Sequence, residues 1–232
     1  LFESVIYGDS AQNLKVEYLN PLIFYRALEQ QDGSSDNVLI GLDFKWNLFK
    51  TISLYGQLVI DELIVSEAFG DAGWWGNKQA FQIGAKYFDV LGITDLNAQV
   101  ELNRVRPYVY SHENNYTSYS HYNMALAHPL GANFQEMLLS MNYRPFAKWR
   151  VSADVLLASY GNDLGNASYG RDIMKSYNRR PADYENELLQ GEETDLIMLQ
   201  GKLTYHFWHN AMIDLDAIYR SESSPSRSRE SV

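Results

Sequence analysis

Apolar and polar residues alternate with a period of two along most of the chain. In NVLIGLDFKW, residues 37–46, the even-numbered positions from Val38 to Trp46 are apolar, whereas Asp43 and Lys45 lie on the opposite face. The same alternation recurs in TISLYGQLVIDE, KQAFQIGAKYF, WRVSADVLLAS, LIMLQGKLTYHF and AMIDLDAIYR. This period is typical of β-strands with two unlike faces. The pattern therefore predicts an all-β chain.

The lengths of the connections between these strands favour one architecture. The expected gaps are 30–36, 46–50, 63–77, 88–94, 107–134, 144–148, 160–194 and 207–210. Longer and shorter gaps alternate, as expected for an outer-membrane barrel with short turns at one end and long loops at the other. A Greek-key sandwich gives no reason for this sorting. We therefore predict an antiparallel up-and-down transmembrane β-barrel, with about ten strands visible.

Aromatic residues lie where the short turns are expected. The pairs are Trp46 and Phe49, Tyr87 and Phe88, Phe146 and Trp149, and Phe207 and Trp208. Rings of this kind favour the headgroup level of a membrane, so they are interpreted as one interfacial girdle. A second girdle is expected near the long loops, from Trp74, Trp75, Tyr108, Tyr110 and Tyr160. The alternative explanation is the general preference of Trp and Tyr for strands.

The two faces of the strands differ in chemistry. Charged residues gather opposite the apolar positions, namely Asp61, Lys86, Glu101, Asp154, Lys202, Asp214 and Asp216. In a barrel these side chains face the lumen, whereas in a soluble sandwich they face solvent. Alternation alone does not separate the two, but the loop lengths and aromatic positions favour the barrel. We therefore expect Leu54, Ile83, Leu199 and Leu215 on the outside of a cylinder.

The composition of the chain argues against several classes of function. The net charge is −10, and a basic run is lacking before the last few residues, so nucleic acid is not an expected partner. The chain has no cysteine, which excludes disulfides, cysteine–zinc sites and thiol catalysis. Residues 1–221 are assigned to the barrel region. Residues 222–232, ESSPSRSRESV, are assigned to a disordered polar tail. The chain starts on Leu1, and we interpret it as a mature or cut chain.

Four segments resemble a known family. They are YLNPLIFYRALEQ, SSDNVLIGLDFKW, LYGQLVIDE and YNMALAHPLGANFQE, with ELNRVRPYVYSHENN before the last. Together they resemble the gliding-motility protein RemB and the related Wzi-like capsule-assembly proteins of Bacteroidota, over roughly residues 3 to 220. The resemblance implies a many-stranded barrel in the bacterial outer membrane, without a cofactor. Family barrels have more than ten strands, so this chain would be the C-terminal part of one.

Two long loops supply candidate binding residues. The segment HYNMALAHPLGANFQE breaks the alternation and is rich in small residues, so we expect it to fold inward as a plug, with His128, Asn133 and Glu136 facing a ligand. The loop 161–194 combines rings and guanidinium groups that suit sugars and acidic polysaccharide. Its candidate residues are Tyr169, Arg171, Tyr177, Arg179 and Arg180. An ordinary solvated loop is the alternative in each case.

Charged residues gather at the ends of two expected strands and are candidates for catalysis or metal binding. Glu101, Arg104 and Arg106 share one strand end, and Asp61 and Glu62 lie near another. Paired carboxylates can hydrolyse glycosides, but arginine partners keep carboxylates ionised, so structural lumen ion pairs are favoured over catalysis. Glu101, Arg104 and Arg106 are also candidate ligand-binding residues of the lumen. A metal site is not expected, because the spacings of His112, Glu113, His121 and His128 match no zinc pattern.

The sequence and the resemblance together give a functional hypothesis. We expect a non-enzymatic outer-membrane barrel that contacts lipid and takes part in polysaccharide or capsule attachment, or in gliding motility and adhesion. Its expected partners are surface polysaccharide or proteins of the gliding and capsule machinery. A passive outer-membrane porin and a soluble carbohydrate-binding β protein are the alternatives.

Overall fold

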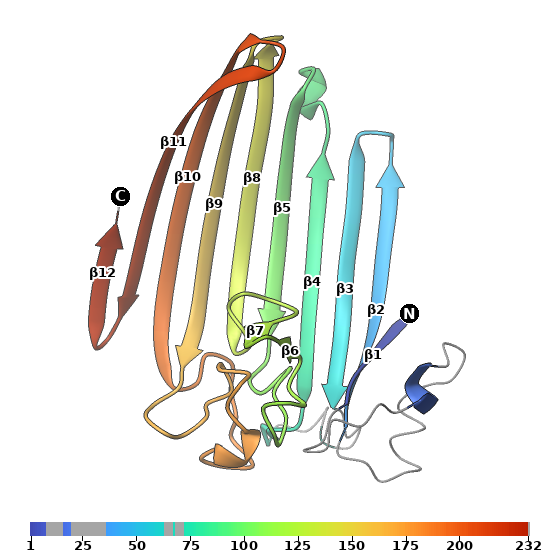
Figure 1. The fold of residues 1–232 in the computed structure, drawn as a ribbon, viewed down its shortest axis with the longest axis vertical. Helices are drawn as coiled ribbons and strands as arrows, with labels where there is room; N and C mark the ends of the chain where they lie inside the picture. The colour runs from blue at the N-terminus through green and yellow to red at the C-terminus, as the bar shows by residue number, and fades with distance from the viewer. Residues whose placement is uncertain (8–15, 20–35, 63–66, 68–71, 232) are drawn as a thin grey trace.

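The computed structural model describes residues 1–7, 16–19, 36–62, 67 and 72–231. Ten strands form one antiparallel sheet in chain order (Figure 1). They are β1 (Phe2–Ile6), β2 (Asn37–Leu48), β3 (Ile52–Glu62), β4 (Lys78–Tyr87), β5 (Leu96–Val105), β8 (Phe134–Phe146), β9 (Trp149–Asn162), β10 (Glu192–Trp208), β11 (Ala211–Ser224) and β12 (Arg227–Ser231). A separate two-stranded ladder joins β6 (Ser120–His121) and β7 (Met124–Ala125). Three short 3₁₀-helices are η1 (Val16–Leu19), η2 (Val90–Gly92) and η3 (Tyr177–Arg179).

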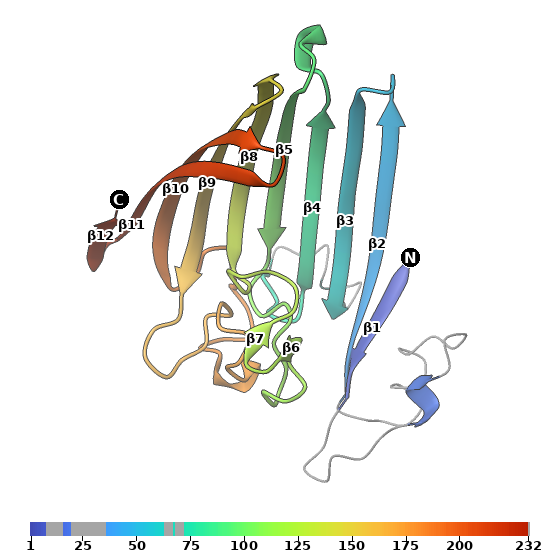
Figure 2. The same cartoon turned by 45° about the horizontal axis from the view of Figure 1, so that its top comes forward.

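The prediction of an all-β, antiparallel, up-and-down chain is confirmed, and so is the estimate of about ten strands. The ten strands do not themselves close into a barrel. Within the described residues β1 pairs only with β2, and β12 pairs only with β11, so both are edges. Figure 1 places these edges on opposite sides of the sheet. Figure 2 shows that the sheet is curved, so that β10 and β11 lie out of the plane of β2 to β4.

The sorting of connections by length is also confirmed. The connections 49–51, 88–95, 147–148 and 209–210 lie at one end of the sheet, and 72–77, 106–133 and 163–191 lie at the other. The two-residue turn 225–226 is a short connection at the long-loop end. The expected gap 30–36 lies outside the described residues except for residue 36.

One face of the sheet is predominantly apolar, and we call it the outer face. The register aligns Ile83 of β4 with Leu102 of β5, and Leu102 with Met137 of β8. Further along the same row, Leu157 of β9 opposes Ile197 of β10. Ile83 and Leu199 are 51 % and 42 % exposed, and Leu215 is 68 % exposed. The described residues form no second sheet over this face.

The opposite face, which we call the inner face, carries the core of the molecule. The long loops 106–133 and 163–191 pack against it at the long-loop end of the strands (Figure 2). The cluster contains Leu39, Val59, Ala80, Val105, Val109, Tyr110, Ala132, Phe134, Ala158, Tyr160, Ile173 and Leu196. Thus apolar burial joins loops to sheet, whereas the outer face remains uncovered by the described chain.

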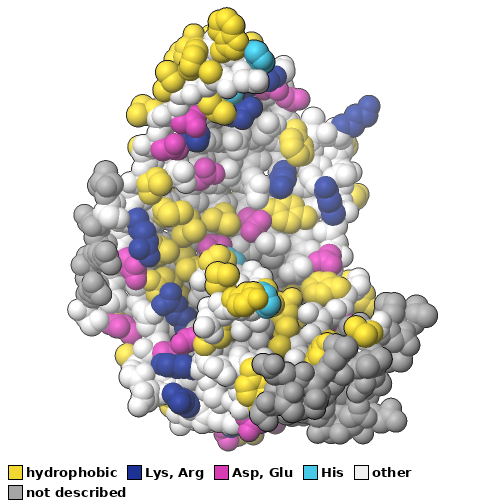
Figure 3. Space-filling view, viewed as in Figure 1, with side chains coloured by type: hydrophobic (Ala, Val, Ile, Leu, Met, Phe, Trp, Pro, Cys, Tyr) yellow, Lys and Arg dark blue, Asp and Glu magenta, His cyan; other side chains and the backbone are white. Residues whose placement is uncertain are grey.

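The two expected aromatic girdles have different outcomes. At the short-turn end, aromatic side chains are exposed, including Phe49, Phe146 and Trp208, and Figure 3 shows hydrophobic side chains gathered there. The prediction of their place is confirmed. The second girdle is wrong, because Tyr108 and Tyr160 are buried in the loop core and not on the outer face. Tyr160 packs in the apolar cluster between the loops and the inner face, and Tyr108 is fully buried.

The C-terminal segment differs from the predicted disordered tail, 222–232. Residues 222–224 complete β11, and residues 227–231 form β12, which pairs with β11 from Arg220 to Ser224. A polar sequence can still extend a sheet, because an edge strand offers a row of unpaired backbone N–H and C=O groups. The sheet therefore continues beyond residue 221.

Candidate functional site

A row of hydrogen-bonded polar side chains crosses the inner face. Glu101 of β5 accepts hydrogen bonds from the hydroxyl of Tyr55 at 2.5 Å, from Gln82 Nε2 at 2.9 Å and from Asn103 Nδ2 at 3.0 Å. Asn103 also donates to Glu136 Oε1 of β8 at 2.8 Å. The network therefore joins four neighbouring strands and fixes two carboxylates on one face.

A glycine allows this network to form. Tyr55 of β3 and Glu101 of β5 lie on either side of Gly84 in the register of β3, β4 and β5. A Cβ atom at Gly84 would overlap the Tyr55 ring. The missing side chain lets the ring lie across β4, so that its hydroxyl reaches the next strand.

His128 holds the loop 106–133 to this network. Its Nδ1 atom accepts a hydrogen bond from the Leu130 N–H at 3.2 Å, so we assign the proton of the neutral ring to Nε2. Nε2 then donates to Glu136 Oε1 at 3.1 Å. The ring also stacks on Phe134, with 4.4 Å between ring centroids. The segment expected to fold inward therefore contacts the inner face.

The Pro-Leu-Gly turn connects the two long loops. The Gly131 N–H donates to the carbonyl of His128 at 3.0 Å, and Gly131 has a positive φ of 80°. A side chain at Gly131 would be strained there and would contact the Arg171 carbonyl. That carbonyl accepts from the Ala132 N–H at 3.2 Å.

Asn133 is a second link between the loops, and its side chain is fully buried. Its Nδ2 donates to the carbonyls of Gly161 at 2.9 Å and Gln190 at 2.8 Å. Its Oδ1 accepts from the Leu189 N–H at 2.7 Å. Asn133 was predicted to bind a ligand. Its amide nitrogen and oxygen instead hydrogen-bond to backbone groups, so Asn133 positions the loops.

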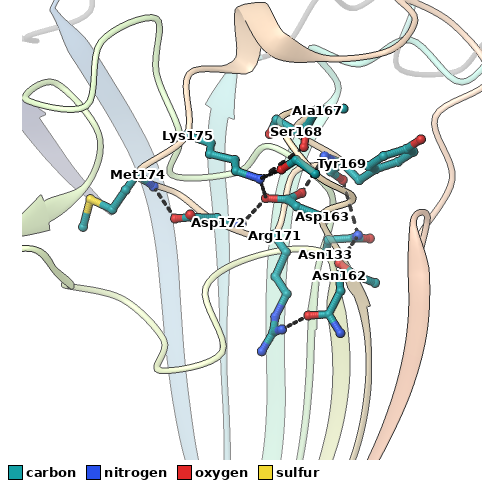
Figure 4. A network of polar contacts seen from close by, with 12 residues as sticks. Asn133, Asn162, Asp163, Ala167, Ser168, Tyr169, Arg171, Asp172, Met174 and Lys175 are labelled. Atoms are coloured by element: carbon teal, nitrogen blue, oxygen red, sulfur yellow. Dashed lines mark hydrogen bonds and ion pairs between the residues drawn. The ribbon is translucent and has the colours of Figure 1, made fainter. Parts of the chain in front are cut away.

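The loop 163–191 is organised around Asp163 (Figure 4). The Asp163 carboxylate accepts from the Tyr169 N–H at 2.5 Å and lies 3.5 Å from Lys175 Nζ. Lys175 donates to the carbonyls of Gly165 and Ala167. Arg171 donates to Asn162 Oδ1 and lies 3.7 Å from the centroid of the Tyr160 ring. These charged groups therefore connect residues 162–175 through contacts within the loop.

Next to this network is an aromatic cluster around Trp75. Its ring centroid lies 4.6 Å from that of Tyr177 and 4.1 Å from the guanidinium carbon of Arg180. Lys78, with no exposed surface, lies 4.6 Å from the Tyr177 ring and pairs with Asp61 at 3.8 Å. Burial raises the pKa of Tyr177 to about 12, so its hydroxyl stays protonated. The guanidinium–aromatic contacts are therefore made within the protein.

The predicted ion pairs around Glu101 are wrong. Arg104 is three residues from Glu101 in β5, and residues three apart in a strand point to opposite faces. The exposed Arg104 side chain therefore belongs to the outer face, with that of Leu102. Arg106 donates to the carbonyls of Asn77 at 2.8 Å and Asn186 at 3.4 Å, and burial lowers its pKa. Neutral donors bind Glu101 instead.

The predicted site residues therefore fall into separate places. Glu101, His128 and Glu136 share the inner-face network, whereas Asn133, Tyr169 and Arg171 belong to the loop network. Tyr177 and Arg180 join the Trp75 cluster, and the side chain of Arg179 is exposed. In the described part of the chain, His, Asp and Glu side chains form no group of three able to hold a metal ion.

Tyr55, Gln82 and Gln99 were missed as candidates. Alternation places each on the polar face, but the contacts with Glu101 depend on strand register. The missing side chain at Gly84 was a possible sequence signal for this contact. However, the strands that pair with the Gly84 strand could not be identified from one sequence.

Comparisons with known proteins give no relative on which to base an assignment. No protein-family model matches the chain, and no curated protein or solved structure matches it. None of the helices in the described residues has the length and apolar character needed to cross a membrane.

His112 gives the loop core a predicted pH dependence. Burial, followed by the nearby charge of Lys78, lowers the pKa of His112 from its ordinary value of 6.5 to about 4. The folded state therefore favours the neutral ring, so the stabilisation is complete above about pH 6.5 and is lost as the pH falls towards 4. By linkage, the loss is at most about 3 kcal/mol.

We expect His112→Gln to reduce this acid sensitivity. The difference in unfolding free energy between pH 7 and pH 4.5, measured by urea titration, should be smaller in the variant than in the unchanged protein. Equal differences in the two proteins would mean that His112 does not contribute.

Proposed function

We propose that this chain is part of the wall of a bacterial outer-membrane β-barrel and that its outer face contacts lipid. The observation that carries the proposal is the exposed apolar outer face, which is continuous from Ile83 through Leu102 to Met137 in register. Large exposed apolar patches mark contacts with membrane or protein. The opposite face is polar and supports folded loops, as in the lumen of a barrel.

The ten described strands leave two open edges. In hydrocarbon, an unpaired backbone group costs several kcal/mol, so the edges β1 and β12 would need partners. We propose that further strands pair with these edges and complete a larger barrel. This proposal agrees with the resemblance to RemB-like and Wzi-like proteins, whose barrels have more than ten strands.

The proposed role is non-enzymatic binding of surface polysaccharide, in capsule attachment or in gliding motility and adhesion. The inner face offers fixed amide, phenol and carboxylate groups from Gln82, Asn103, Tyr55 and Glu101. Such groups hydrogen-bond sugar hydroxyls. Other proteins of the gliding or capsule machinery would contact the loops.

Fractionation of cells that make the complete protein tests this proposal. We expect the protein in the outer-membrane fraction after a carbonate wash, with release only by detergent. Recovery in the soluble fraction without detergent would contradict the proposal and favour a soluble carbohydrate-binding β protein.

A passive porin is the second candidate, favoured by the polar inner face. The loop 106–133 lies against that face through His128 and Glu136, so we propose that it acts as a plug. Replacing residues 121–130 with a short Gly-Ser linker should speed the swelling of liposomes in small neutral sugars. Rapid swelling with the unchanged protein would favour the porin. Equally slow swelling with the unchanged protein and the variant would contradict the proposal that the loop is a plug.

A further inference from the structure

A hollow of about 650 Å³ on the inner face is lined by lysine side chains. Lys45 of β2 and Lys86 of β4 lie on either side of β3, and Lys50 lies in the β2–β3 turn. Figure 3, which shows the inner face, has Lys and Arg side chains grouped over β2 to β4. The hollow borders the Glu101–Glu136 network through Tyr55, and its lining shares no residue with the loop core.

These three lysines form no ion pair with the residues that the structure describes, although the chain is strongly acidic. Two carboxylates on the same face bind neutral donors: Asp43 accepts from Gln57 at 2.7 Å, and Glu101 accepts from Tyr55 at 2.5 Å. By contrast, Lys202 on the inner face of β10 pairs with Asp214 at 2.9 Å and Asp216 at 3.6 Å. The hollow therefore gathers three ammonium groups that form no ion pair with a carboxylate of the described residues.

The floor of the hollow has a second feature that suits a polar ligand. Ser53 is 4 % exposed, and its hydroxyl makes no hydrogen bond within the described residues. Buried hydroxyl groups are normally hydrogen-bonded. Beside it, the Tyr55 ring lies 5.6 Å from Lys86 Nζ, and the Asn47 amide completes the lining. Ammonium, hydroxyl, amide and ring thus face one space.

We propose that this hollow binds an acidic saccharide, with its carboxylate groups on Lys45, Lys50 and Lys86. The lysines neutralise the carboxylates, Ser53 and Asn47 hydrogen-bond hydroxyl groups, and the Tyr55 ring contacts the apolar face of a sugar ring. The volume lies in the range of small-molecule sites. This inference rests on the proposed polysaccharide-binding function and names its ligand class and position.

Binding of trigalacturonate to the detergent-solubilised complete protein, measured by calorimetry, tests the site. We expect tighter binding than for neutral maltotriose, and weakening as salt is added. The double variant Lys45→Gln/Lys86→Gln should lose at least about tenfold in affinity, because hydrogen bonds to charged groups contribute more than neutral ones. Ser53→Ala should weaken binding without lowering the stability of the free protein.

Lys202→Gln is the matched control, because it removes a charge from the same face away from the hollow. It should bind trigalacturonate as the unchanged protein does, and circular dichroism should show that all variants are folded. Equal affinity for maltotriose, or equal affinity in the double variant, would overturn the site. Competition by inorganic phosphate at equal concentration would identify a general anion site and overturn the saccharide assignment. Fractionation tests the membrane proposal separately, so the two failures are distinguishable.

Discussion

Leu199→Arg is expected to destabilise the folded protein in lipid vesicles by about 2–4 kcal/mol, as for charges on the lipid face of barrels. Leu199 lies near the middle of β10, on the outer face, and is 42 % exposed. At the same exposure in water, the substitution would change stability by only about 0.5 kcal/mol. Urea titration of the protein folded in vesicles measures the difference.

Gln200→Arg is the matched control, because the neighbouring residue lies on the inner face opposite Asp154. We expect a small effect, since the new charge faces a polar environment and a carboxylate. Similar effects of the two substitutions would argue that the outer face does not contact hydrocarbon.

Lys78→Met is expected to destabilise the loop core by about 3–5 kcal/mol, because it removes the ammonium partner of a buried carboxylate. Lys78 and Asp61 have 0 % and 2 % exposed side chains, and Lys78 Nζ also donates to the Ser111 carbonyl at 3.2 Å. Asp61 in turn accepts from the Tyr110 N–H at 2.6 Å. Hydrogen exchange in residues 106–133 should therefore speed up, and the unfolding free energy should fall.

The control is Lys202→Met, which removes a lysine from a partly exposed ion pair. Such pairs contribute about 0–1 kcal/mol, so its effect should be small. A comparably small effect of Lys78→Met would show that the charges around Asp61 do not hold the loops in place.

The strands and their order could be predicted because each depends on local pattern. Alternation identified the apolar positions of β4 and β10, such as Ile83 and Leu199, and loop lengths identified the up-and-down topology. Closure could not be predicted, because it depends on the partners of β1 and β12. The pairing of β12 was missed because polar residues pair through the backbone, which composition does not reveal.

The site was less predictable than the fold. His128 and Glu136 were both candidates because they lie in the apolar, turn-rich segment 121–136, but their mutual contact, at 3.1 Å, is known only from the structure. The contact between Tyr55 and Glu101 across Gly84 joins residues that are 46 positions apart in the chain, so it depends on strand register. The guanidinium groups of Arg171 and Arg180 appeared available for sugars, but the nearby Tyr160 and Trp75 rings engage them. Long-range packing decides which polar groups remain open.

Spin labels at single cysteines test most directly whether the outer face contacts lipid. The chain has no native cysteine, so labels can be placed at Ile83, Leu199 and Leu215 and, for comparison, at Gln82 and Gln200. In the membrane-inserted protein, the first three should collide with dissolved oxygen and be protected from a water-soluble nickel complex, whereas the last two should show greater nickel access. Equal nickel access on both faces, or protection of the first three from both reagents, would contradict lipid contact at the outer face.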